Sequence, residues 1–357
     1  LRRARRPATR LVVEIPSREG SGDSIGNLRS LACPPRQAFS FGPEAPIPDR
    51  RPQRHALAFL LLLAACSGGP EEGGGRSGVL PAPARAAIET ADDAGRLVRL
   101  AAPAGRIVSL VPSVTETVVA LGEAERLIAR TDYDHGPAVD RLPSLGGGLD
   151  PSPEALVALD PDLVVGWSSA RDSRLRALLE TAGIPFYAAA NEDTADVFRT
   201  FDRVGRLLGT RAAAERLAAV VRDSLAAVAA DRPPGPRPTV LFTIPGAPPR
   251  TAGPATFVAQ IIEIAGGSSA FPELAERWPE VSLEAVVARR PDVLVVAVEP
   301  GGRPLALLAG QAGWRDLEAV REGRVVGVDA DLFTRPGPRL PEAARALQRA
   351  LAGLAPR

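Results

Sequence analysis

Glu154 and Glu284 occupy the same position in two copies of one sequence pattern. Residues 152–165 align without a gap on residues 282–295, and eight of the fourteen aligned positions are identical. Each copy has a Ser typical of a helix N-cap, a Glu in the first helical turn, and a Pro-Asp pair before an apolar run typical of a buried strand. A carboxylate at a helix start usually stabilises only its own helix, by ~0.3–1 kcal/mol. A helix start accepts many residue types, however, so the same choice in both copies favours a shared functional role.

Apolar periodicity predicts the elements that carry the two copies. Strands are expected at 106–111, 162–166 and 185–189, and again at 239–244, 292–298 and 324–328. They alternate with helical patterns, as in parallel sheets covered by helices on both faces. Residues 210–230 keep helical spacing over ~30 Å and end at a proline-rich segment. The sequence therefore predicts an α/β protein of two Rossmann-like lobes with parallel sheets, joined by a single long bridging helix.

Ser113 and Glu116 follow the first predicted strand with the spacing of a helix capping box. In such a box the two side chains accept hydrogen bonds from free backbone N–H groups at the helix start. The apolar helix that follows is expected to end at Gly122.

Residues 50–66 have the pattern of a lipoprotein signal peptide. A basic stretch precedes a ten-residue apolar run and small residues that end at Cys66, and the run is too short to span a bilayer stably. Residues 63–66 resemble a lipobox, in which the Cys is acylated and becomes the mature N-terminus. A buried apolar segment with an unrelated Cys is the alternative. Residues 1–49 are expected to be an upstream or disordered extension, and 67–100 a flexible tether.

Charge and residue counts argue against several function classes. From residue 56 onward 32 arginines face 37 acidic residues, which gives no electrostatic case for nucleic-acid binding. His55 and His135 are the only histidines, so a histidine-rich metal site is not expected, and His135 is predicted to be a solvated loop residue. No cofactor, phosphate-binding loop or serine-hydrolase elbow is indicated. An exported α/β enzyme using carboxylate chemistry remains open as an alternative of another class.

Three segments, 106–116, 149–165 and 278–284, resemble the iron-siderophore, haem and vitamin B12 class of periplasmic substrate-binding proteins of ABC importers. The vitamin B12-binding branch is the most similar, and the resemblance covers about residues 104–350. It implies the helical-backbone periplasmic binding protein fold, with an N-terminal lobe at 101–209, a bridging helix at 210–232 and a C-terminal lobe at 233–357. It also implies a monomeric, non-enzymatic protein, lipid-anchored at Cys66 in the periplasm or at the cell surface.

The resemblance further implies which residues contact partners. Glu154 and Glu284 match the glutamates that dock into arginines of the membrane permease, which works with an ATPase. The implied ligand contacts are Tyr133, Trp167, Arg250, Phe271, Trp278, Asp331 and Arg335. Aromatic rings suit the apolar face of a cobalamin or other corrinoid, and the Asp-Arg pair suits its polar edge. Arg250 stands where the B12-binding branch has an aromatic residue, so a ferric siderophore or haem remains open as the ligand.

Overall fold

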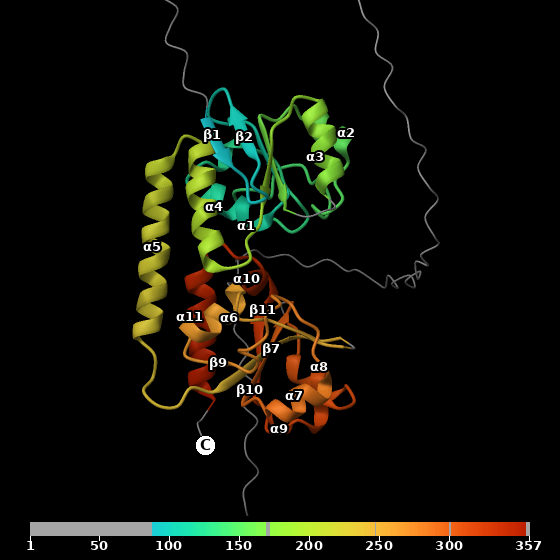
Figure 1. Cartoon of the computed structure of the whole chain (residues 1–357), viewed down its shortest axis with the longest axis vertical. Helices are drawn as coiled ribbons and strands as arrows, with labels where there is room; N and C mark the ends of the chain where they lie inside the picture. Colours follow the sequence, from blue (N-terminus) through green and yellow to red (C-terminus); the bar gives the residue numbers. More distant parts are fainter. Residues whose placement is uncertain (1–87, 169–171, 247, 300, 355–357) are drawn as a thin grey trace, which may run out of the picture. The chain divides into compact units, whose positions relative to one another are not determined.

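Two α/β lobes make up the described part of the chain, which in this computed structural model comprises residues 88–354 except 169–171, 247 and 300. Figure 1 shows one lobe built mainly from residues before α5 and the other from residues after it. The predicted fold class is confirmed: each lobe has a sheet with parallel pairing at its centre and helices on both faces.

The N-terminal lobe contains a four-stranded parallel sheet in the order β4-β3-β5-β6. Its strands are β3 (Ile107–Ser109), β4 (Leu127–Ala129), β5 (Leu163–Trp167) and β6 (Phe186–Ala189). Its helices are α1 (Pro112–Ala120), α2 (Pro153–Ala158), α3 (Asp172–Thr181) and α4 (Thr194–Leu207). Along β5, Val164 joins one buried cluster and Val165 another. Successive strand residues point to opposite faces, so the continuous apolar run is explained by burial on both sides.

The C-terminal lobe repeats this plan with the strand order β11-β10-β7-β8, and β9 pairs with β7. The strands are β7 (Thr239–Ile244), β8 (Arg250–Thr251), β9 (Ser268–Ser269), β10 (Val293–Val298) and β11 (Val325–Asp329). The helices are α6 (Phe257–Ile264), α7 (Leu283–Arg289), α8 (Pro304–Ala309), α9 (Glu318–Arg321), α10 (Ala330–Thr334) and α11 (Leu340–Gly353). Alternate residues of β10 again enter two clusters: α6 and α11 cover one face of the sheet, and α7 to α9 the other (Figure 1).

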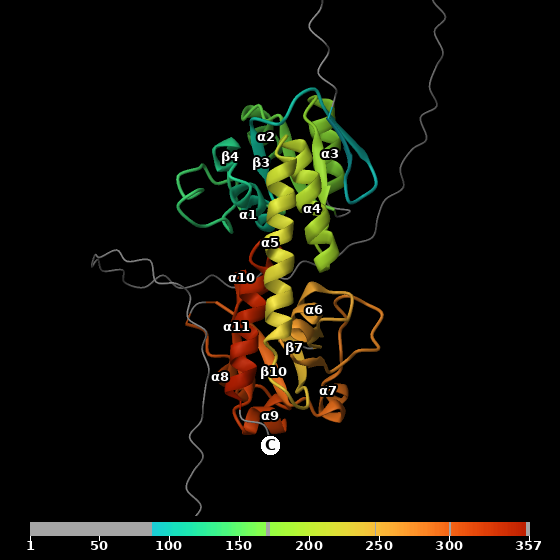
Figure 2. The same cartoon turned by 90° about the vertical axis from the view of Figure 1, so that its left-hand side faces the viewer.

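The predicted connecting helix is α5 (Arg211–Ala230), which runs along both lobes in Figure 2. Ala214 packs in the core of the N-terminal lobe, and Val221 and Val228 pack in that of the C-terminal lobe. Helix α4 also takes part in both cores, because Phe201 joins the C-terminal cluster and Leu207 the N-terminal one. Two adjacent helices therefore hold the lobes together.

The predicted tether ends earlier than residue 100. Strands β1 (Ile88–Ala91) and β2 (Leu97–Leu100) form an antiparallel hairpin. Val98 and Leu100 are buried in the N-terminal lobe, because alternation along β2 turns them inward. In the hairpin turn, Asp93 forms an ion pair with Arg203 of α4. Burial nevertheless raises the pKa of Asp93, although a hydrogen bond from the Ala190 N–H and the Arg203 charge oppose that rise.

Candidate ligand site and docking surface

The two repeat copies fold into the same local structure. Ser152 Oγ accepts a hydrogen bond from the Ala155 N–H at 3.2 Å, and Ser282 Oγ accepts one from the Ala285 N–H at 3.1 Å. Both predicted Ser caps are therefore confirmed. Each short helix is followed by a residue in the left-handed region, Asp160 and Arg290, both with φ of 46°.

The Asp of each Pro-Asp pair fastens the repeat to its lobe. Asp162 Oδ2 accepts hydrogen bonds from the Gly105 and Arg106 N–H groups, both at 2.8 Å. Asp292 Oδ2 accepts one from the Thr239 N–H at 2.8 Å. These carboxylates bond the backbone just before β3 and at the start of β7, so the repeated Asp has a structural role that the sequence pattern did not reveal.

Glu154 and Glu284 are exposed at the starts of α2 and α7. A hydrogen bond from its own backbone N–H, followed by one from the neighbouring Ser hydroxyl, lowers the pKa of each carboxyl. Both side chains are therefore ionised at neutral pH and available to a cation.

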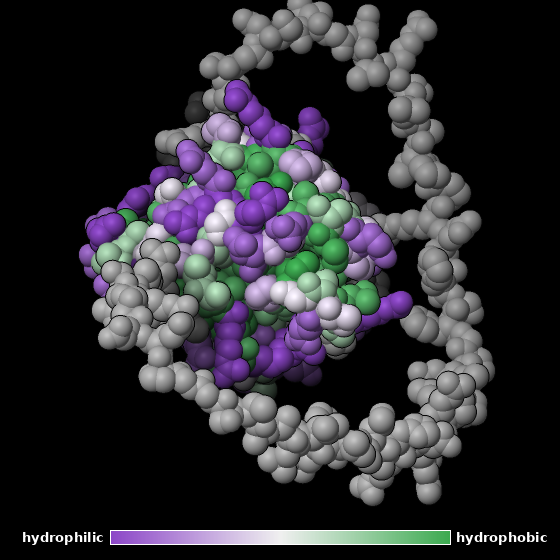
Figure 3. Space-filling model, turned by 90° about the horizontal axis from the view of Figure 1, so that it is seen from above, coloured by the Kyte–Doolittle hydropathy of each residue, from purple (hydrophilic) through white to green (hydrophobic). Residues whose placement is uncertain are grey.

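An exposed valine accompanies each of these carboxylates. Val157 and Val287 lie three residues after the glutamates, on the same helix face, with 43% and 48% of their surface exposed. Each lobe thus presents one negative charge beside one apolar side chain. Figure 3, which views the end of the molecule that carries α2 and α3, shows hydrophobic surface next to hydrophilic side chains there.

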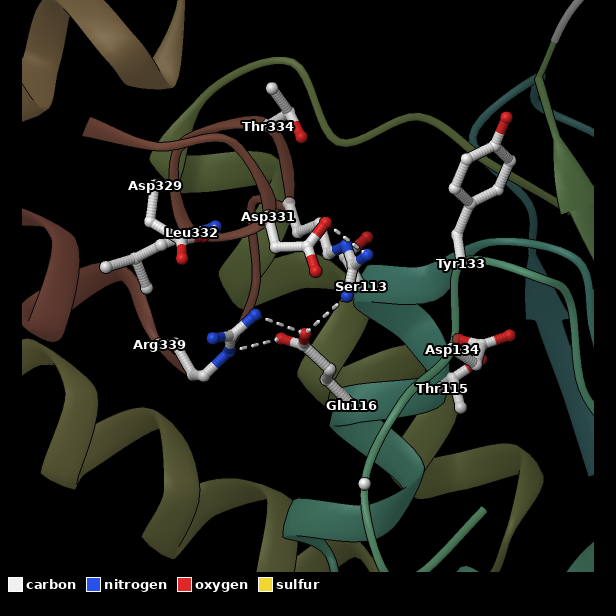
Figure 4. A network of polar contacts seen from close by, with 12 residues as sticks. Ser113, Thr115, Glu116, Tyr133, Asp134, Asp329, Asp331, Leu332, Thr334 and Arg339 are labelled. Atoms are coloured by element: carbon white, nitrogen blue, oxygen red, sulfur yellow. Dashed lines mark hydrogen bonds and ion pairs between the residues drawn. The ribbon is translucent and has the colours of Figure 1, made fainter. Parts of the chain in front are cut away.

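A polar network joins the two lobes near α1 and α10, as Figure 4 shows. Glu116 of α1 accepts two hydrogen bonds from Arg339, 2.7 Å from Nη2 to Oε1 and 3.1 Å from Nε to Oε2. Arg335 lies 3.7 Å from the same carboxylate and also pairs with Asp331. The predicted Asp331 and Arg335 are therefore in contact, and the structure adds Glu116 and Arg339 to them.

The hydrogen bond to Glu116 keeps Arg339 strongly basic. Burial alone would lower the pKa of Arg339, but the hydrogen bond and charge of Glu116, with further contributions from Glu342 and Asp329, raise it above its ordinary value. Bidentate contact between guanidinium and carboxylate fixes both the distance and the orientation of the two groups. The pair therefore holds α1 against the start of α11.

The predicted capping box at Ser113 and Glu116 is wrong. Helix α1 begins two residues earlier than that box requires, at Pro112, and its N-cap Val111 has no side chain that could cap it. Ser113 Oγ instead accepts a hydrogen bond from Asn191 Nδ2 at 3.0 Å. Both residues of the motif thus serve contacts beyond their own helix.

The aromatic residues predicted to contact the ligand lie in different environments. Trp167 is half-buried against the N-terminal core, and Trp278 is half-buried with its ring edge-on to Phe242 at 6.3 Å. Tyr133 is 54% exposed. Phe271 is only 4% exposed, and the Arg289 guanidinium lies 5.2 Å from its ring centre, so this ring is part of the core.

Arg250, one position at which the chain departs from the B12-binding pattern, is already paired. Its Nη2 lies 3.3 Å from Glu280 Oε1, and both side chains are exposed. This guanidinium is therefore not a free positive charge, and it gives no particular support to an anionic ligand.

The remaining findings concern a cavity among the described residues, possible metal sites or membrane segments, and the predicted signal peptide. A cavity of about 450 Å³ lies beneath the proline-rich loop after α5 and contains none of the predicted ligand residues. Within the described residues there is no cluster of three or more potential metal ligands, and no helix there is long and apolar enough to cross a membrane. Cys66 and the predicted signal peptide lie outside the described residues.

The two-lobed α/β body, its connecting helix and the polar contact between the lobes point to a substrate-binding protein. Residues 107–332 match the model of the family described as periplasmic binding protein, and the chain belongs to that family. Its members bind substrates for transport and are not enzymes, so the enzyme alternative is set aside. They act outside the cytoplasm.

Relatives and solved structures agree with this assignment. A cobalamin-binding protein of Halobacterium salinarum is 33% identical over 251 residues, which cover 66% of this chain and 66% of that relative, just under two thirds of its length. A vitamin B12-binding protein of Vibrio parahaemolyticus is 25% identical and covered to 86%. The apo structure of the periplasmic heme-binding protein RhuT from Roseiflexus sp. RS-1 superposes with a TM-score of 0.62 at 30% identity, covering 70% of this chain and 98% of that one.

Proposed function

We propose that this protein captures a corrinoid, such as cobalamin, between its two lobes and delivers it to the permease of an ABC importer. The observation that carries the ligand assignment is the similarity to proteins named for binding cobalamin and vitamin B12. The site supports it with Asp331 and Arg335, which form one polar pair at the junction of the lobes. Such a pair offers both acceptors and donors to the amide groups at the edge of a corrin ring.

Trp167 and Trp278 are the proposed aromatic contacts, one from each lobe. Both are half-buried, so part of each ring remains accessible. An indole ring combines a large apolar face with little conformational entropy to lose, which suits a flat macrocycle. Tyr133, with more than half of its surface exposed, is the proposed additional contact from the N-terminal lobe.

Haem is the second candidate ligand, because the similar structure from Roseiflexus is named a heme-binding protein. Ferric siderophores are the third, from the resemblance of the sequence motifs. Titration of the purified body with cobalamin, cobinamide, haem and ferric siderophores distinguishes these ligands by quenching of tryptophan emission. Quenching by cobalamin that is reduced in both Trp167→Phe and Trp278→Phe is the expected result. Quenching by haem alone would replace the corrinoid with haem.

The proposed permease contacts are Glu154 and Glu284. They are supported by their equivalent positions on two lobes, their exposure, and the matching valines beside them. Two similar surfaces on one protein suit a partner with two similar subunits, each supplying an arginine for a charge-assisted pair. A lipid anchor at Cys66 would keep this body close to the membrane. Both contacts use one copy of the chain, so we expect a monomer.

A further inference from the structure

Charges are balanced in the polar network that forms the floor of the proposed ligand site. We call the floor the four side chains of Glu116, Asp331, Arg335 and Arg339. Its two guanidinium groups, Arg335 and Arg339, both contact Glu116, and Arg335 also pairs with Asp331. Two cations thus meet two carboxylates, and Asp329 and Glu342 add negative potential around Arg339. No net positive charge remains at this floor to attract an anionic ligand.

Glu116 is the member of this group that comes from the opposite lobe. Its side chain is 22% exposed and that of Arg335 only 10%, so water screens their contact incompletely. A ligand carboxylate placed beside these arginines would have to displace Glu116 or lie next to it, and like charges brought together in such a site are unfavourable. An uncharged amide avoids this repulsion.

We propose that Glu116 is a specificity-determining residue that neutralises the arginines of the floor and thereby selects an amide-bearing ligand over a carboxylate-bearing one. This inference rests on the proposed function, because it assumes that the ligand lies against Arg335 and Asp331. It assigns to Glu116 a role in choosing the ligand in addition to its contact between the lobes.

Two matched variants separate charge from structure. Glu116→Gln and Arg339→Gln disrupt the same cross-lobe contact, but they change the charge of the floor in opposite directions. A purely structural role predicts that both variants affect ligand binding in the same direction. The double variant restores neutrality without the ion pair, so a selectivity set by charge should return to that of the unsubstituted protein.

The probes are cobalamin and its monocarboxylic acids, in which one side-chain amide is hydrolysed to a carboxylate, with each isomer titrated separately. The measured quantity is the affinity for each isomer divided by the affinity for cobalamin. For the isomer whose carboxylate faces the floor, Glu116→Gln should raise this ratio roughly tenfold, and Arg339→Gln should lower the ratio by a similar factor. Raising the ionic strength from about 0.05 to 0.5 M should diminish both shifts.

The outcomes distinguish this inference from the proposed function. If the unsubstituted protein binds cobalamin, but no isomer shows shifts of opposite sign in the two variants, the role of Glu116 is wrong and the corrinoid assignment stands. If it binds haem tightly and cobalamin not at all, both are wrong, because a neutral floor should disfavour the haem carboxylates. Absence of binding to every probe would likewise overturn both.

Discussion

Replacing Glu154 and Glu284 by Gln tests the docking surface with the least disturbance to the fold. Gln keeps the shape of the side chain and can still contact the Ser hydroxyl, and both positions are exposed. Because the two glutamates lie on separate lobes, losses in permease binding should be independent. We expect each variant to weaken binding to the permease roughly tenfold, and the double variant about a hundredfold, as is typical for loss of charge-assisted pairs.

Three assays are needed for these variants. Tryptophan quenching measures the affinity of the isolated body for cobalamin, thermal melting measures its stability, and uptake through the reconstituted importer measures delivery. Ligand affinity and melting temperature should not change, whereas uptake at limiting protein concentration should fall. Val220→Ser, at an exposed valine on α5 away from either repeat, is a control that should leave uptake unchanged. Normal uptake by the double variant would refute docking, and lost ligand binding would move these carboxylates into the ligand site.

The remaining predictions concern stability and attachment. Asp162→Ala removes the acceptor of two backbone hydrogen bonds and should lower the free energy of unfolding by about 1–3 kcal/mol, whereas Asp292→Ala removes one and should cost about half as much in denaturant melts; equal effects would contradict this assignment. Because the folded-state pKa of Asp93 is raised, its contribution to stability should fall as pH rises from about 4 through that pKa, and Asp93→Asn should abolish this part of the pH dependence. Cys66→Ala should release an intact body from the membrane fraction, and unchanged fractionation without attached acyl mass would exclude the lipid anchor.

Local patterns in the sequence predicted three parallel strands in each lobe, the two short repeat helices and the connecting helix. Strand β7 has the predicted bounds, and α5 agrees with the predicted helix within one or two residues. These elements have strong periodicity and end at Pro or Gly, so the chain itself marks their limits. The hairpin of β1 and β2 was missed because two four-residue strands give too short a pattern to separate from a tether.

Long-range contacts were harder to predict than elements. Arg339 binds Glu116 from 223 positions away along the chain, and no local signal marks either residue as a partner of the other. The spacing of Ser113 and Glu116 instead suggested a local cap, which the neighbouring Pro112 made unnecessary by starting the helix earlier. Phe271 was correctly placed in the C-terminal lobe, but only packing could assign its ring to the core.

The measurement that tests the central claim most directly is calorimetric titration of the purified body with cobalamin. The account predicts one cobalamin per chain with a dissociation constant of about a micromolar or lower, equivalent to roughly −8 kcal/mol. It also predicts a rise in melting temperature at saturation, because ligand at about 100 times its dissociation constant adds ~2.7 kcal/mol to stability. Absence of a binding isotherm with cobalamin, together with saturable binding of haem or a ferric siderophore by the same preparation, would contradict the account.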